Sequence, residues 1–208
     1  MPYLILLRHG QSEWNALGLW TGLTDIELNA EGIEEAQRAA DALKDIRIDV
    51  AFTSMLKRAQ ETLKVVLDGT GAANVPISKN AALNERDYGD LTGKNKWKIR
   101  DEYGEDLFMK WRRSWDYPVP GGETLKDVYD RVVPYFKQEI GPELAAGRNV
   151  AIVAHGNSLR ALIKYLENVS DEDIPGLELG TAEVYLYETD TSGKVLSKEI
   201  RAVNTNVV

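Results

Sequence analysis

Only two histidines occur in the chain, and both stand in the same local pattern. His9 lies in LLRHGQSEWN and His155 in VAHGNSLRAL, where each ends an apolar run and is followed by glycine. A single strand-end histidine is as often a structural side chain as a functional one. Two histidines in the same local setting indicate a shared crevice flanked by two helix N-termini. Free N–H groups and the helix dipole there favour a bound phosphate or carboxylate.

Arginines stand beside this expected crevice. Arg8 directly precedes His9, and Arg58 falls about one turn into a helix that should follow a strand at 48–53. The neighbouring Lys57 is interpreted as part of a solvated helix face. The chain is acidic, with a net charge of −8, and such a surface repels nucleic acid. A compact group of arginines in an acidic protein therefore points to a small anion.

Composition excludes several kinds of chemistry. The chain has no cysteine, which rules out disulfides, a thiol nucleophile and cysteine-bound zinc or iron–sulfur centres. No carboxylate cluster has an obvious metal-ligand spacing. No basic leader and no apolar run of roughly 18 residues is visible, so we expect a soluble, cytoplasmic protein that does not bind membranes.

Hydrophobic periodicity gives the elements that must position these residues. Strands are expected at 3–8, 48–53 and 149–154, and a closing hairpin at 183–188 and 194–201. Helices are expected at 30–45, from a Ser54 N-cap to about 67, at 95–115 with a break near Gly104, at 123–140 with a kink at Pro134, and at 157–166. In the first helix, Asn29 is the expected N-cap and Ile33, Ala36, Ala40 and Leu43 the expected apolar stripe.

The alternation of strands and helices predicts the fold class. We expect an α/β fold in which residues 1–208 form a single domain, with a mainly parallel central sheet and helices on both faces. Ligands in such folds bind at the carboxyl ends of the strands, which is where both histidines are expected.

Five segments, in order along the chain, resemble a known family. They are LLRHGQSEWN, FTSMLKRAQET, LNERDYGDLTGKNK, KWRRSW and VAHGNSLRALIKYL, which together span residues 4 to about 168. The first and last resemble the histidine phosphatase superfamily as a whole. The NERDYG segment, the surroundings of Lys96 and the WRR pair are more specifically similar to its cofactor-dependent phosphoglycerate mutases. Trp111 and Trp115 are interpreted as packing residues.

The resemblance implies phosphoryl transfer through a phosphohistidine. His9 matches the nucleophile, and its second ring nitrogen should donate a hydrogen bond to a group such as a backbone carbonyl. Arg8, Arg58 and a protonated His155 match the groups that stabilise the transferred phosphoryl group. Glu85 matches the general acid and base, with an ion pair to Arg86 as the alternative interpretation.

Further binding residues carry over from the same resemblance. They are Ser12, Asn15, Thr21, Gly22, Tyr88, Lys96, Arg112, Arg113, Gly156 and Asn157. Adjacent helical residues point about 100° apart, so Arg112 and Arg113 can share one ligand only near a helix end or in a loop. The implied partner is a small phosphorylated hydroxy acid, with 2,3-bisphosphoglycerate as phosphoryl primer and no metal.

The chain departs from the mutase pattern in three places. Only about ten residues separate Arg113 from the helix near Glu123, Leu179-Gly180-Thr181-Ala182 replaces a Pro-Thr-Gly segment, and the tail AVNTNVV is short. A shorter tail should admit water, which competes for the phosphohistidine. The alternatives are therefore a histidine phosphatase acting on small phosphate monoesters and an inactive anion-binding module. Longer members of the family carry an insertion after the arginine pair, and this insertion often contributes to subunit contacts. Because this chain has only a short segment there, we expect a monomer or a weak homodimer.

Overall fold

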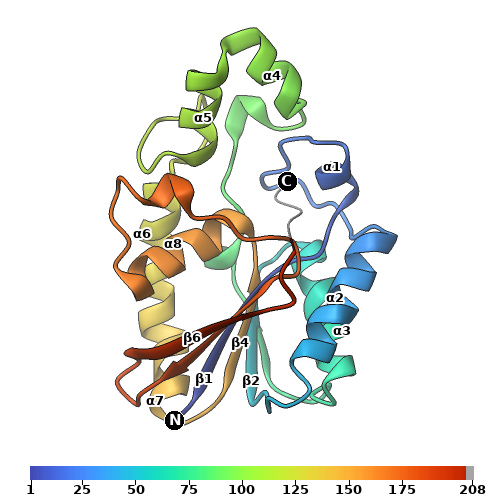
Figure 1. Ribbon diagram of the computed structural model, residues 1–208, viewed down its shortest axis with the longest axis vertical. Coiled ribbons are helices and arrows are strands. Elements are labelled where there is room, and N and C mark those ends of the chain that lie inside the picture. Colours follow the sequence, from blue (N-terminus) through green and yellow to red (C-terminus); the bar gives the residue numbers. More distant parts are fainter. Residues whose placement is uncertain (205–208) are drawn as a thin grey trace.

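The computed structural model describes residues 1–204, and in this part of the chain six strands form one sheet (Figure 1). The strand order is β3-β2-β4-β1-β5-β6, with β1, β2, β3 and β4 parallel and β5 and β6 antiparallel to their neighbours. The bounds are β1 Tyr3–Arg8, β2 Val50–Thr53, β3 Ile77–Lys79, β4 Val150–Ala154, β5 Val184–Thr189 and β6 Val195–Arg201. The predicted α/β class, mainly parallel sheet and closing hairpin are confirmed. The short, exposed β3 was not predicted.

Helices cover both faces of this sheet, as the alternation predicted (Figure 1). Leu4 and Leu6 of β1 pack in a cluster with α6 (Leu125–Tyr135) and α8 (Gly156–Glu167). Ile5 and Leu7 point the other way, toward α2 (Ala30–Ala42) and α3 (Lys57–Gly69). Since successive side chains of a strand alternate between faces, an uninterrupted apolar run is what a strand covered on both sides requires.

Two further helices form a separate helical cap above the carboxyl ends of the strands (Figure 1). They are α4 (Lys96–Tyr103) and α5 (Glu105–Arg113), broken at Gly104 as predicted, where φ is +85°. The cap packs around its own small apolar cluster, made of Trp20, Leu91, Ile99, Phe108, Trp111 and Val119. The predicted packing role of Trp111 is confirmed, and Trp115 packs against the larger core near α6 and α8.

Two local predictions were wrong, those of the Ser54 cap and of a buried Ile33. The helix α3 begins at Lys57 after Leu56, because Ser54 Oγ accepts a hydrogen bond from the Leu56 N–H and also contacts His155. Ile33 is 42% exposed, since the buried face of α2 carries smaller residues and one carboxylate, Glu35. The predicted helix over 123–140 is present with Pro134 inside it, and it passes into a π-helical turn at Phe136–Ile140 just after the proline.

The remaining elements are short. They are α1 Glu13–Ala16, α7 Gly141–Ala145 and three 3₁₀ turns at Ala81–Leu83, Gly89–Leu91 and Ile174–Gly176. Asn29 is the N-cap of α2, as predicted, and accepts a hydrogen bond from the Gly32 N–H at 2.8 Å.

Candidate functional site

The two histidines meet at the carboxyl edge of the sheet. Strands β1 and β4 are parallel neighbours, and Arg8 is in register with Ala154, so the residues that follow emerge side by side. The His9 N–H donates to the Ala154 carbonyl at 2.9 Å, and the ring centroids of His9 and His155 are 5.0 Å apart. The predicted crevice exists. We call the group of His9, His155, Arg8 and Arg58 the histidine crevice.

Hydrogen bonds select one tautomer of His9. Its Nδ1 lies 2.6 Å from the Gly10 carbonyl oxygen, which can only accept, so Nδ1 carries the proton. Arg58 Nε, which can only donate, lies 3.3 Å from Nε2, so Nε2 carries the lone pair. Burial, Arg58 and Arg8 lower the pKa of His9 well below its ordinary value, which keeps the ring neutral. The predicted bond to a backbone carbonyl is confirmed, and the lone pair of Nε2 faces Arg58.

Backbone carbonyls hold the two arginines of the crevice. Arg58 donates to the carbonyls of Gly22 and Thr24, both at 2.9 Å, and Arg8 donates to the carbonyl of Leu179 at 2.5 Å. Burial lowers the pKa of Arg58 to about 10 and also lowers the pKa of Arg8, yet both remain cationic at neutral pH. The two carbonyls that Arg58 contacts are neutral, so they leave the positive charge of its guanidinium available to an anion.

The surroundings of His155 disfavour a positive charge on its ring. It is fully buried, its Nε2 lies 2.8 Å from Ser54 Oγ, and its Nδ1 has no hydrogen-bond partner among residues 1–204. Burial, Arg58 and His9 lower its pKa well below the ordinary value, so the protein by itself favours a neutral ring. A protonated His155 during phosphoryl transfer stays a prediction. A phosphoryl group beside the ring would bring opposite charge and raise the pKa again.

Glu85 lies between the histidine crevice and the helical cap. Its Oε1 accepts hydrogen bonds from the Arg86 N–H at 2.8 Å and the Asn157 N–H at 3.1 Å. The alternative of an ion pair with Arg86 does not fit. The Arg86 guanidinium donates instead to the carbonyls of Trp111 and Arg112, and it stacks over the Tyr88 ring at 4.6 Å.

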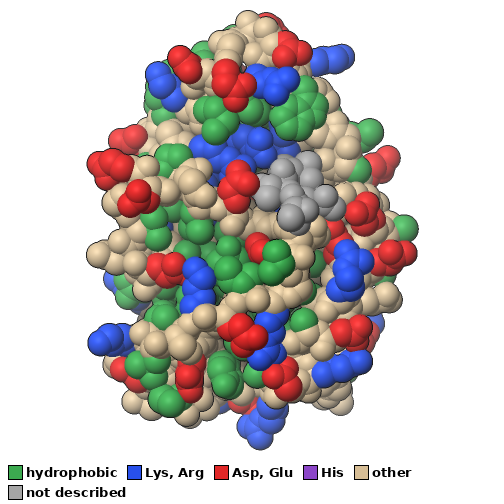
Figure 2. Space-filling view, viewed as in Figure 1, with side chains coloured by type: hydrophobic (Ala, Val, Ile, Leu, Met, Phe, Trp, Pro, Cys, Tyr) green, Lys and Arg blue, Asp and Glu red, His purple; other side chains and the backbone are tan. Residues whose placement is uncertain are grey.

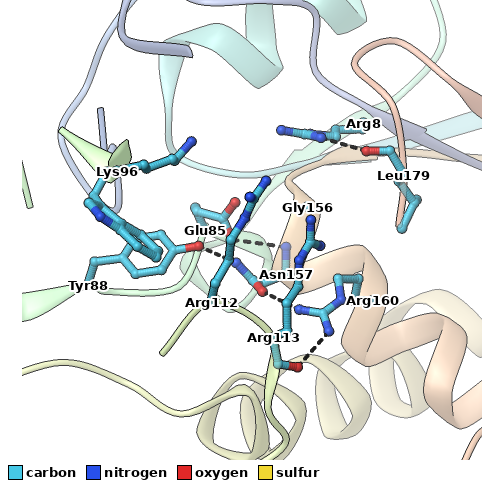
Figure 3. Close-up of a pocket in the computed structure, with 11 residues that line it drawn as sticks. Arg8, Glu85, Tyr88, Lys96, Arg112, Arg113, Gly156, Asn157, Arg160 and Leu179 are labelled. Atoms are coloured by element: carbon cyan, nitrogen blue, oxygen red, sulfur yellow. Dashed lines mark hydrogen bonds between the residues drawn. The ribbon is translucent and has the colours of Figure 1, made fainter. Parts of the chain in front are cut away.

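Two adjoining cavities open onto these groups and share Arg8, Glu85, Tyr88 and Lys96. The cavity on the His9 side is also lined by His9, Asn15, Thr21, Gly22 and Arg58. The cavity under the helical cap is also lined by Arg112, Arg113, Gly156, Asn157 and Arg160 (Figure 3). Ser12 lies outside both linings: it is fully buried, and its Oγ donates to Asn15 Oδ1 at 2.9 Å as the N-cap of α1. Its direct role in binding is not supported, and it orients Asn15 instead.

The helical cap supplies the second group of cations. Arg112 and Arg113 are the last two residues of α5, so the predicted helix-end arrangement is confirmed (Figure 3). Arg113 also pairs with Glu178. Burial and then the neighbouring arginines lower the pKa of Lys96 to about 7. Burial and then Arg112 lower the pKa of Arg113 to about 10. Lys96 and Arg113 thus lie close to other cations, and a bound anion would raise their pKa values again.

Sequence reasoning missed Arg160. This buried residue of α8 donates to Asn157 Oδ1 at 2.9 Å and to the carbonyls of Arg113 and Ile174 at 2.9 and 2.8 Å. It thereby joins the α8 wall of the cavity to the end of α5. An arginine inside the otherwise apolar run LRALI, three residues after Asn157, was the available signal.

The family comparison agrees with this geometry. A model of the histidine phosphatase superfamily (branch 1) matches residues 4–200. The chain belongs to this superfamily. It is 52% identical to a protein of Cytophaga hutchinsonii, over 90% of this chain and 88% of that protein. It is 49% identical to a protein of Parvibaculum lavamentivorans, over 95% of each. Both superfamily members are named 2,3-bisphosphoglycerate-dependent phosphoglycerate mutase, and the predicted resemblance to mutases is confirmed.

Solved structures of the superfamily share the fold. A mycobacterial glucosyl-3-phosphoglycerate phosphatase has a TM-score of 0.81 and 26% identity, covering 98% of this chain and 100% of that one. The alpha-ribazole phosphatase from Shigella flexneri has a TM-score of 0.76 and 25% identity, covering 99% and 98%.

Residues 1–204 contain neither a cluster of metal-binding side chains nor a membrane-spanning helix. Among residues 1–204, no group of three or more His, Asp or Glu side chains is placed to hold a metal ion. No helix in that range has the length and apolar character needed to cross a membrane.

Proposed function

We propose that the protein is a phosphoglycerate mutase, which interconverts 3-phosphoglycerate and 2-phosphoglycerate through a phosphohistidine at Nε2 of His9. The observation that carries the proposal is the fixed tautomer of His9, with its lone pair facing Arg58 in a crevice of cations. The names of relatives about 50% identical over most of the chain support the choice of substrate. Cytoplasmic location, a single domain over residues 1–208 and a monomer or weak homodimer are parts of the same proposal.

The donor set suits 2,3-bisphosphoglycerate, which has a phosphate at each of two neighbouring positions and a carboxylate. Arg8 and Arg58 would hold the phosphate nearer His9, while the cations of the helical cap would hold the other anionic groups. The bound primer supplies the phosphoryl group that His9 receives. In this scheme the guanidinium groups provide the positive charge that a metal ion provides in other phosphoryl-transfer enzymes.

In the proposed reaction, the Nε2–P bond forms while the ester P–O bond of the donor breaks. Glu85 gives a proton to the departing oxygen and later takes one from the attacking hydroxyl. The Gly10 carbonyl holds Nδ1–H, so that the ring attacks as a neutral nucleophile. Arg8 and Arg58 are held by carbonyls and stabilise the charge that spreads over the equatorial phosphoryl oxygens.

A histidine phosphatase acting on small phosphate monoesters is the second candidate. It is favoured by solved superfamily structures named as phosphatases, at 25–26% identity. A monoester that has no carboxylate would leave Lys96 and the arginine pair of the cap without that group to bind.

Product analysis separates the two candidates. The purified protein would be incubated with 3-phosphoglycerate and EDTA, with and without 2,3-bisphosphoglycerate, and both 2-phosphoglycerate and free phosphate would be measured. We expect rapid isomerisation that depends on the bisphosphate, and none with His9→Ala. Release of phosphate without 2-phosphoglycerate would replace the mutase proposal with the phosphatase.

A further inference from the structure

One buried carboxylate plays no part in the reaction described above. Glu35 lies on the inner face of α2, is 1% exposed and is absent from the linings of both cavities. A carboxylate in such a place is costly unless hydrogen bonds satisfy it. The groups that donate hydrogen bonds to Glu35 therefore indicate its role in the structure.

The first partner belongs to the loop that carries the nucleophile. Glu35 Oε2 accepts a hydrogen bond from the Gln11 N–H at 2.7 Å. The same peptide group presents the Gly10 carbonyl, which accepts the Nδ1–H of His9 at 2.6 Å. One peptide thus bridges a carboxylate and the nucleophilic imidazole. A carboxylate that accepts the N–H of a peptide polarises its carbonyl, and a chain of hydrogen bonds strengthens each of its members.

Contacts on both sides fix this bridging peptide. The Gly10 N–H donates to Thr62 Oγ1 at 3.0 Å. A Cβ at position 10 would lie 2.2 Å from the Gly32 carbonyl oxygen, and one at Gly32 would lie 2.0 Å from the Gln11 carbonyl oxygen. The loop and the first turn of α2 are thus in direct backbone contact, which leaves the peptide no room to turn.

The other oxygen of the carboxylate is held from the opposite direction. Glu35 Oε1 accepts hydrogen bonds from Thr181 Oγ1 at 2.8 Å and from Asn204 Nδ2 at 2.6 Å. Thr181 is fully buried, and the next residue, Ala182, donates its N–H to the Arg8 carbonyl at 3.1 Å. Glu35 is therefore held on one side by Thr181 and Asn204, and these contacts orient its other oxygen toward the Gln11 N–H.

We propose that Glu35 is a positioning residue that acts through the Gly10–Gln11 peptide. Its carboxylate fixes the peptide plane, holds His9 in the Nδ1–H tautomer and raises the electron density at Nε2. The arrangement resembles a carboxylate that orients a catalytic histidine directly, with one peptide group inserted between the two. The inference rests on the proposed nucleophilic role of His9 and applies equally to a mutase and to a phosphatase.

Glu35→Gln tests the inference, because it keeps the shape of the side chain and removes its charge. The rate of phosphoenzyme formation should fall about tenfold to a hundredfold, which is typical when an orienting outer partner is lost. The KM for 3-phosphoglycerate should stay within about twofold, since Glu35 lines neither of the two cavities at the histidine crevice and the helical cap. Nitrogen chemical shifts of the His9 ring should show the Nδ1–H tautomer in the wild type and a mixture of tautomers in the variant.

Two further variants separate positioning from stability. Glu34→Gln changes the exposed neighbour on α2 and should alter neither rate nor ring shifts. Thr181→Val removes one hydrogen bond from Oε1 but keeps the carboxylate on Gln11, so at an equal loss of Tm its rate should fall much less than that of Glu35→Gln.

Specific results would overturn the inference. Wild-type rate and ring shifts in folded Glu35→Gln would do so, as would equal rate losses in Glu35→Gln and Thr181→Val at matched Tm. If Glu35→Gln does not fold, an Nε2–H tautomer of His9 in the wild type would be sufficient to reject it. Absence of phosphohistidine in the wild type would contradict the proposed function, whereas a labelled wild type that does not isomerise would leave this inference standing.

Discussion

The histidine crevice and the helical cap are built in different ways. In the crevice, Arg8 and Arg58 bond to backbone carbonyls beside strand ends that lie in the main core. In the cap, Lys96, Arg112 and Arg113 stand on two short helices with a small apolar cluster of their own. The crevice is thus fixed by the sheet, and the cap is attached to it as a separate layer.

Charge differs between the two regions as well. Figure 2 shows Lys and Arg side chains gathered in a hollow beneath the cap, and the cap cations crowd one another. Burial and that crowding lower the pKa of Lys96 to about 7, while burial lowers the pKa values of Arg58 in the crevice and Arg113 in the cap to about 10. We infer that the crevice performs the chemistry on any phosphate monoester, while the cap selects the rest of the substrate. Substitutions in the two regions should therefore have different signatures.

The largest effect should come from the crevice. Arg58→Gln removes a fixed charge beside Nε2 of His9, so kcat should fall about 10²- to 10³-fold, as when a preorganised donor to a transition state is lost. The loss should be similar for 3-phosphoglycerate and for a generic monoester such as p-nitrophenyl phosphate. Steady-state kinetics on both substrates checks this, with thermal unfolding to confirm the fold. A loss confined to phosphoglycerate would contradict the division of roles.

A smaller and selective effect should come from the cap. Arg112→Ala should lower kcat/KM for phosphoglycerate roughly tenfold to a hundredfold, because a charge-assisted hydrogen bond is worth about 1.5–3 kcal/mol. Hydrolysis of the generic monoester should change by less than about threefold, since it has no carboxylate to hold. Lys110→Ala, an exposed cation on the same helix, is the matched control. Equal losses on both substrates would show that Arg112 does not select the substrate.

The smallest effect should be a pH dependence that belongs to Lys96. Its amine is protonated below about pH 7 and neutral above it, so its attraction for an anion is lost as the pH rises. We expect kcat/KM for phosphoglycerate to decline through neutral pH by roughly a few-fold, with the break in kcat at higher pH because the bound anion raises the pKa. Lys96→Arg should remove the break at neutral pH. A break that persists in this variant would assign it to another group.

Sequence patterns predicted the crevice better than the rest. Two apolar runs ending in His-Gly are a local signal, and the rule that parallel strands present their carboxyl ends together converts it into a site. The end of α5 was also predictable, because only there can Arg112 and Arg113 face one ligand. Features that depend on tertiary packing could not be predicted in this way. The short edge strand β3 has no apolar periodicity, and the lowered pKa of His155 depends on burial beside Arg58.

The missed residues share a physical cause. Arg160 and Glu35 are buried charged groups, and most of their partners lie far away in the chain. The sequence can therefore show an odd charged residue on an apolar face, but not the groups that it contacts. The exposure of Ile33 has a related origin. The buried face of α2 lies so close to the loop at Gly10 and Gln11 that it is lined by Gly32 and alanines, and the larger Ile33 side chain is turned to solvent.

The central claim is that Nε2 of His9 carries the phosphoryl group during turnover. The most direct measurement is rapid-quench labelling with ³²P-labelled 2,3-bisphosphoglycerate, followed by peptide mapping under alkaline conditions, where phosphohistidine survives. We predict a label on His9 that forms at least as fast as turnover, disappears on addition of 3-phosphoglycerate and is absent in His9→Ala. A fully active enzyme that acquires no label, or one labelled at another residue, would contradict the account.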